Sequence, residues 1–171
     1  MKIRFLNTQD VTAYRDLRLQ ALKESPIAFG SSYEQEICFS LSDFAARLQP
    51  HNDPANGIFG AFNNHKILVG MLGFSRENRL KRSHIGSLWS MYVLPEFRSQ
   101  GIGAFLLDTA LAYARQLGSL RQIILTVNTN NLVASSLYQS RGFRRFGLER
   151  EALLIDGTYF DEEHLVLYLN P

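Results

Sequence analysis

The sequence contains few of the residues that mark disulfide-rich, metal-binding or membrane proteins. Its one cysteine, Cys38, cannot form an internal disulfide, and a reducing cytoplasmic location is therefore expected. No apolar run approaches the ~18 residues that a membrane span requires, and Met1–Phe5 lack the features of a signal peptide. The spacing of the histidines and the cysteine does not match that of zinc ligands, so no metal site is predicted. The histidines are His51, His65, His84 and His164.

The sequence also lacks a large excess of charge of one sign. Lys and Arg number 18 and Asp and Glu 16, and this formal net charge of +2 is too even to indicate a nucleic-acid binder. Two charged clusters are typical of solvated turns, although the acidic one could also attract a cationic substrate. The basic cluster comprises Arg76, Arg79, Lys81 and Arg82 around Glu77, and the acidic cluster comprises Asp156, Asp161, Glu162 and Glu163.

The hydrophobic pattern predicts one α/β domain. With 171 residues, 46% of them hydrophobic and 20% charged, residues 1–171 have the size and composition of one globular domain. The predicted order is β-α-α-β-β-β-α-β-α-β-β, an α+β mixed sheet flanked by helices. Asp156-Gly157 is a strong hairpin signal, and Ser42 is expected to cap a helix over 43–48. The expected strands are 2–6, 58–62, 66–74, 84–94, 122–127, 143–155 and 158–169, and the helical segments are 8–24, 31–48, 101–118 and 132–140.

Residues 89–103 have the pattern of an anion-binding loop. A strand leads through a short loop into a helix whose first residues include Gly101 and Gly103. Backbone N–H groups at a helix N-terminus are free to bind an anion, and the helix dipole adds to the attraction. Arg98 supplies a full positive charge beside this site. A pyrophosphate is the expected ligand.

Three phosphate-binding motifs compete for this loop. A P-loop requires Gly-Lys-Ser/Thr, which is absent from the sequence. A dinucleotide-binding fingerprint requires a third glycine where Leu106 stands and an acidic residue where the next strand ends at Asn128. The third motif, the Arg/Gln-x-x-Gly-x-Gly/Ala loop of coenzyme A-dependent acetyltransferases, matches residues 98–103 in full.

A second motif lies downstream. Asn131, Ala134 and Tyr138 are spaced at i, i+3 and i+7, which places them on one face of a short helix before Arg141-Gly142-Phe143. A tyrosine on such a face is usually a core residue. Its combination with the pyrophosphate loop favours a functional role.

Together these motifs make the sequence resemble the GCN5-related N-acetyltransferase (GNAT) superfamily. The resemblance covers the whole chain in element order and is sharpest from His84 to Phe143. It implies a bulged fourth strand that splays from the fifth, with acetyl-CoA bound in the wedge as cosubstrate. The implied function is transfer of the acetyl group to a primary amine of a small molecule or peptide by direct attack on the thioester. A homodimer is possible. The alternative function is that of a coenzyme A-binding sensor or structural module without turnover.

The resemblance also implies roles for individual residues. Tyr138 would be the general acid that protonates the leaving thiolate. A main-chain N–H freed by the bulge, at Met91, would stabilise the oxyanion. The expected cofactor-binding residues are Met91, Tyr92, Val93, Arg98, Ser99, Gln100, Gly101, Ile102, Gly103, Ala104 and Asn131.

The general base is left open by the sequence. Relatives place a glutamate on the fourth strand, where this chain has Ser87, or on the fifth strand, where it has Thr126. Glu34 is the first candidate, Glu36 and His84 are others, and a chain of water molecules would also serve.

Overall fold

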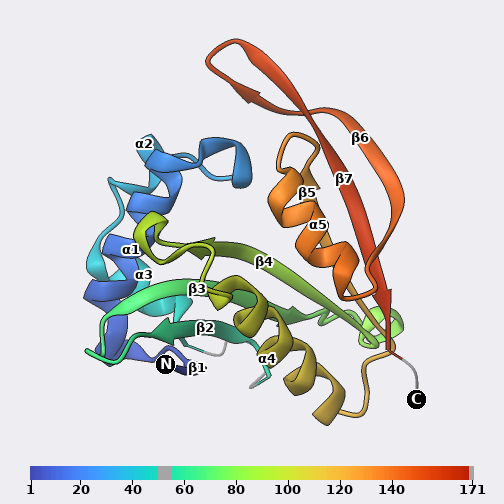
Figure 1. The fold of residues 1–171 in the computed structure, drawn as a ribbon, viewed down its shortest axis with the longest axis horizontal. Helices are drawn as coiled ribbons and strands as arrows, with labels where there is room; N and C mark the ends of the chain where they lie inside the picture. The colour runs from blue at the N-terminus through green and yellow to red at the C-terminus, as the bar shows by residue number, and fades with distance from the viewer. Residues whose placement is uncertain (50–54, 170–171) are drawn as a thin grey trace.

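Seven strands form one mixed sheet in the computed structural model, which describes residues 1–49 and 55–169 (Figure 1). The strand order is β1-β2-β3-β4-β5-β7-β6, and neighbouring strands are antiparallel except for the parallel pair β4 and β5. The strands are β1 (Lys2–Phe5), β2 (Gly57–Phe62), β3 (Leu68–Arg76), β4 (Ile85–Val93), β5 (Gln122–Asn128), β6 (Arg144–Ile155) and β7 (Thr158–Tyr168).

Helices flank this sheet, as the sequence predicts. The helix α4 packs on β2, β3 and β4 and buries Ile102, Leu106 and Ala110, which recur every four residues. The helix α1 packs on β3, with α3 against it. The α-helices are α1 (Val11–Glu24), α2 (Tyr33–Glu36), α3 (Leu41–Arg47), α4 (Ile102–Gln116) and α5 (Leu132–Ser140), and a 3₁₀ turn, η2 (Pro26–Ala28), follows α1.

The predicted element order and mixed sheet are confirmed, and one helix cap is corrected. The segment 31–48 forms the two short helices α2 and α3. The prediction that Ser42 caps the second of them is wrong, because α3 begins at Leu41. Ser40 is its N-cap, and its hydroxyl accepts the backbone N–H of Asp43 at 3.2 Å in a capping box.

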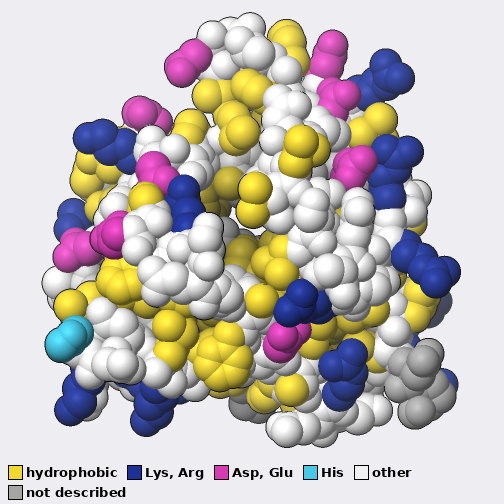
Figure 2. All heavy atoms as spheres, viewed as in Figure 1, with side chains coloured by type: hydrophobic (Ala, Val, Ile, Leu, Met, Phe, Trp, Pro, Cys, Tyr) yellow, Lys and Arg dark blue, Asp and Glu magenta, His cyan; other side chains and the backbone are white. Residues whose placement is uncertain are grey.

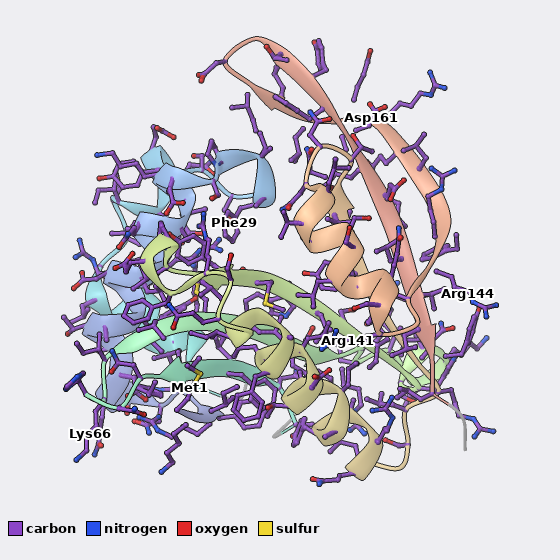
Figure 3. The ribbon with its side chains drawn as sticks, in the orientation of Figure 1. Met1, Phe29, Lys66, Arg141, Arg144 and Asp161 are labelled. Carbon is purple, nitrogen blue, oxygen red and sulfur yellow. The ribbon has the colours of Figure 1, made fainter. Side chains whose placement is uncertain are left out.

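The C-terminal hairpin extends beyond the rest of the sheet (Figure 1). The expected turn at Asp156-Gly157 joins β6 to β7, and both residues have positive φ, 49° and 77°, as a tight hairpin turn requires. Figure 3 shows Arg144 at the start of β6 and Asp161 on β7, the second strand of this hairpin. Within the described residues, no helix is both long and apolar enough to cross a membrane.

The sheet opens between its two parallel strands. β4 and β5 pair only over Ile85–Ser87 and Gln122–Ile124, and the strands separate beyond that point. Close to the opening, β4 carries a bulge in which two residues, Ser90 and Met91, lie opposite the single residue Leu72 of β3. This divergence is the splay that the resemblance implies.

Candidate active site

A cavity of about 880 Å³, here called the wedge cavity, lies where β4 and β5 separate. Its walls come from the end of β4, the start of α4, the first turns of α5 and the segment Glu24–Ala28. Figure 2 shows the surface hollowed in this region, with hydrophobic side chains around the opening. The lining includes all of the predicted cofactor-binding residues except Gln100, whose side chain donates a hydrogen bond to the carbonyl of Glu96.

Unpaired backbone donors lie at one end of the wedge cavity. The first helical hydrogen bond of α4 runs from the N–H of Phe105 to the carbonyl of Gly101, at 2.9 Å. The N–H groups of Ile102, Gly103 and Ala104 precede that bond and have no acceptor among the described residues. Gly101 has φ of 79°, and a Cβ there would meet no atom within 4 Å, so the loop leaves space in front of these donors. The geometry fits a pyrophosphate.

Arg98 is already paired, which the sequence did not indicate. Its Nη2 lies 2.7 Å from Oε1 of Glu24, and its Nε donates to the carbonyl oxygen of Val93 at 2.9 Å. The other oxygen of Glu24 accepts the hydroxyl of Tyr92. Burial and this hydrogen bond raise the pKa of Tyr92 well above its ordinary value. Arg98 therefore ties the end of α1 to the end of β4, and Glu24 balances its charge.

Tyr138 lies on α5 but does not line the wedge cavity. Its ring is buried, 6% exposed, and packs edge-on against Phe143 at 5.8 Å between centroids. Burial raises the pKa of its hydroxyl to about 12. Ala134 and Leu137 of the same helix line the wedge cavity, and Asn131 caps the helix by accepting the N–H of Ala134 at 3.2 Å.

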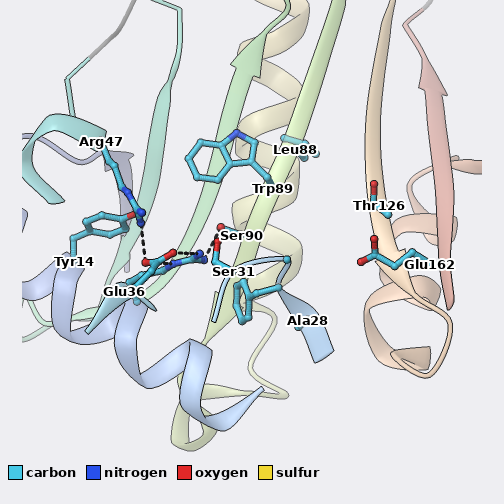
Figure 4. Close-up of a pocket in the computed structure, with 13 residues that line it drawn as sticks. Tyr14, Ala28, Ser31, Glu36, Arg47, Leu88, Trp89, Ser90, Thr126 and Glu162 are labelled. Carbon is cyan, nitrogen blue, oxygen red and sulfur yellow. Dashed lines mark hydrogen bonds and ion pairs between the residues drawn. The ribbon is translucent and has the colours of Figure 1, made fainter. Parts of the chain in front are cut away.

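A second cavity of about 470 Å³, here called the bulge cavity, adjoins the first (Figure 4). Ala28 lines both cavities. The bulge of β4 also belongs to both, because Ser90 lines the bulge cavity and Met91 lines the wedge cavity. A group held at Met91 in the first cavity would therefore be next to the second.

One wall of the bulge cavity is a network of buried charges. Glu36 is 2% exposed, and its carboxylate accepts two hydrogen bonds from Arg18, at 2.8 and 3.1 Å, and one from Arg47, at 2.7 Å. Burial by itself would raise the pKa of Glu36, but these hydrogen bonds outweigh it and hold the pKa below its ordinary value. Arg18 also donates to Oγ of Ser90 at 2.8 Å (Figure 4). The network thus anchors the bulge.

The family is established by comparison with known proteins. Residues 19–143 match the model of the acetyltransferase (GNAT) family. The chain belongs to this family. Over 121 residues it is 31% identical to human N-acetyltransferase 8, covering 67% of this chain and 49% of that protein. Over 130 residues it is 35% identical to the mycothiol acetyltransferase of Geodermatophilus obscurus, covering 75% and 41%. The chain thus spans less than half the length of these two curated relatives.

A solved GNAT structure has the same fold. The phosphinothricin acetyltransferase of Sinorhizobium meliloti, in complex with acetyl-CoA, matches 98% of this chain and 88% of its own with a TM-score of 0.86 and 21% identity. The resemblance that the sequence motifs carry is confirmed at the level of family and fold. Membership of this acetyltransferase family supports acetyl-CoA as the cosubstrate, and among the described residues no cluster of His, Cys, Asp and Glu could hold a metal ion.

The candidate bases differ in whether they line the wedge cavity or the bulge cavity. Glu34 is exposed on α2 and lines neither cavity. His84 is exposed just before β4, at the end of that strand remote from the bulge. Glu36 lines the bulge cavity but is held by two arginines. Thr126 lines it too, and so does Glu162 of β7, which sequence reasoning placed only in an acidic cluster. Alternation along β7, which sends every second side chain to one face, is the signal that could have singled out Glu162.

The basic cluster is remote from the wedge cavity. It precedes the first residue of β4, whereas the wedge cavity begins at the last residues of that strand. Glu77 lies 2.6 Å from Arg79 and 3.6 Å from Arg82, and the hydrogen bond from Arg79 lowers the pKa of Glu77 to about 2. This arrangement is that of a solvated turn with its own counter-charge.

Proposed function

We propose that this GNAT protein transfers the acetyl group of acetyl-CoA to a primary amine. The observation that carries the proposal is the set of unpaired backbone N–H groups at Ile102, Gly103 and Ala104, which face a cavity that continues along the main chain of β4 to Met91. A pyrophosphate at the helix end and an extended arm along β4 would fit this path. When bound, acetyl-CoA supplies an activated acyl group as a thioester.

In this proposal the bulge provides the oxyanion donor. Ser90 and Met91 face one residue of β3, so the regular ladder is interrupted and a main-chain N–H is released from it. We assign this donor to Met91, which lines the wedge cavity where it meets the bulge cavity. A fixed donor aimed at the developing negative charge stabilises the transition state without reorganisation.

Tyr138 is proposed as the general acid. The raised pKa of about 12 keeps its hydroxyl protonated at neutral pH, so it has a proton to donate. On α5 it follows Leu137, which lines the wedge cavity, and this proximity in the helix supports the assignment. The departing thiolate is the group that would take this proton.

We propose the acceptor as a chemical class: a small molecule or peptide that carries a primary amine. The reducing cytoplasm is its proposed setting. The rival function is a coenzyme A-binding module without turnover. Retention of Tyr138 beside an intact loop favours the enzyme.

Two measurements test the proposal. Acetyl-CoA at 100 times its dissociation constant should stabilise the protein by about 2.7 kcal/mol, whereas NAD should not, and a melting curve with each ligand compares them. A panel of primary amines, from alkylamines and polyamines to short peptides, should then include at least one that releases free coenzyme A above the rate without amine. Stabilisation by acetyl-CoA without release by any amine would favour the binding module. No stabilisation would mean that the wedge cavity has been misinterpreted.

A further inference from the structure

Glu162 is the one carboxylate lining the bulge cavity that has no hydrogen bond or ion pair to another described residue. Glu36, the other acidic residue of that lining, is held by Arg18 and Arg47. Figure 4 shows Glu162 beside Thr126 on the wall formed by β5 and β7, across the cavity from Ser90. Its neighbour in sequence, Glu163, is instead paired with Arg145 at 2.9 Å.

The charges around Glu162 leave its carboxylate available for a cation. From β6, Glu149 faces it, and on its own strand lies His164, whose Nε2 is 3.1 Å from Glu149. On the far wall, Arg18 and Arg47 both hydrogen-bond to Glu36, and Arg18 also hydrogen-bonds to Ser90, so neither guanidinium is paired with Glu162. This network keeps one net positive charge. Burial and the negative charge of Glu149 raise the pKa of Glu162, and His164 opposes this effect. A carboxylate with a raised pKa is a stronger base than an ordinary one.

The wall across the bulge cavity from Glu162 is suited to a carbon skeleton. Trp89 of β4 is 39% exposed and lines the bulge cavity. Its indole lies against Gly73 of β3, where a Cβ would come within 2.3 Å of the ring. A side chain at position 73 would displace the indole, so the glycine allows Trp89 to lie flat on the sheet. The aromatic face can contact apolar carbon and attract a cation.

We infer that the bulge cavity is the acceptor site and that Glu162 is the general base of the acetyl transfer, binding a primary ammonium whose apolar or aromatic skeleton lies on Trp89. The inference rests on the proposed function. It assigns the base that the usual strand positions, Ser87 and Thr126, cannot supply.

The reaction then balances as follows. The carboxylate of Glu162 takes one proton from the ammonium, and the N–H bond becomes an O–H bond. The lone pair so released forms the C–N bond to the thioester carbonyl carbon, the C–S bond breaks, and its electron pair leaves on sulfur. The nitrogen loses a second proton, which neutralises the thiolate by way of the general acid. Products are the amide and free coenzyme A, and Glu162 returns its proton to solvent.

The test compares Glu162→Gln with the wild type, using 2-phenylethylamine and hexylamine as probes. The variant should keep the full stabilisation by acetyl-CoA, because Glu162 lies outside the wedge cavity. Its kcat/KM for the amine should fall by about 10²–10⁴, the usual contribution of general-base catalysis. The pH profile of kcat for the wild type should also show an acidic limb, with an apparent pKa above the ordinary glutamate value of about 4.3. The variant should lack that limb. Binding of 2-phenylethylamine in the presence of unacetylated coenzyme A should weaken in the variant.

Glu163→Gln is the matched control, because Glu163 is adjacent in sequence and paired with Arg145 on the other face of the strand. It should keep the wild-type kcat/KM and the acidic limb. Wild-type kinetics and an unchanged limb in Glu162→Gln would overturn the assignment, and so would loss of the limb in Glu34→Gln instead. If the wild type binds acetyl-CoA but acetylates no amine at all, the proposed function itself fails, and the base assignment fails with it.

Discussion

Arg18 and Ser90 are 72 residues apart in sequence, yet the guanidinium of Arg18 donates a hydrogen bond of 2.8 Å to the hydroxyl of Ser90. Ser90 has φ of 54°, a backbone conformation that residues other than glycine seldom adopt. Arg18 is itself oriented by Glu36. The shape of the bulge, and with it the proposed oxyanion donor at Met91, is therefore fixed by a charge on the first helix.

Replacing Arg18 should destabilise the protein strongly. Arg18→Met leaves the buried Glu36 with one ionic partner, Arg47, in place of two. The free energy of unfolding should fall by about 3 kcal/mol, since the buried carboxylate loses two of the three hydrogen bonds that it accepts from charged donors. Urea denaturation measures the change. Arg15→Gln, a half-exposed position on the same helix, is the control and should change it by less than about 0.5 kcal/mol; equal effects would contradict the role of the network.

The same network should make stability depend on pH. Because the folded pKa of Glu36 lies below its ordinary value, its ionised form contributes stability that is fully present at neutral pH. That contribution should be lost as the pH falls from the ordinary glutamate value of about 4.3 through the lower folded value. Denaturation at a series of pH values should show a steeper acid loss for the wild type than for Glu36→Gln. Parallel curves would mean that Glu36 does not contribute through its charge.

A side chain in the phosphate loop should block acetyl-CoA. A Cβ at Gly103 would lie 3.6 Å from Leu137 and 4.0 Å from Val93, both of which line the wedge cavity, so Gly103→Val adds bulk inside it. The variant should fold but lose most of the stabilisation of about 2.7 kcal/mol expected at 100 times the dissociation constant. Melting curves with and without acetyl-CoA provide the measurement. Gly147→Ala, at a glycine of β6 with ordinary contacts to His164, should keep the whole shift. A full shift in Gly103→Val would refute the loop assignment.

Removing one hydroxyl should test the proposed acid. Tyr138→Phe keeps the ring that packs on Phe143, so the melting temperature and acetyl-CoA binding should change little. The turnover number should fall by about 10², near the lower end for general-acid catalysis because a thiolate is a fair leaving group. The KM for acetyl-CoA should stay constant, since the lost interaction forms mainly in the transition state. Steady-state kinetics decide the matter: full turnover would make Tyr138 a packing residue, and weakened coenzyme binding with normal turnover would make it a ligand contact.

Much of this protein could be predicted because the signals are local in sequence. The hairpin at Asp156-Gly157 depends on two adjacent residues that adopt positive φ. The proposed anion loop depends on Gly101 and on N–H groups that a helix always leaves unpaired at its start. The α4 core stripe follows from helical periodicity. Each is decided within a few residues, by backbone sterics or by one element's own hydrogen bonds.

The sequence by itself did not determine which side chains from distant elements would lie next to these charged residues. The pattern indicated a full positive charge at Arg98 beside the loop, but the end of α1 brings Glu24 to it. Glu36 was a candidate base until the packing of α1 and α3 supplied Arg18 and Arg47. Glu162 belonged to an acidic cluster, and the splay of β4 from β5 makes it part of a cavity wall. Charge pairing and burial depend on which elements meet in space, so tertiary structure decided which carboxylate is held and which remains available.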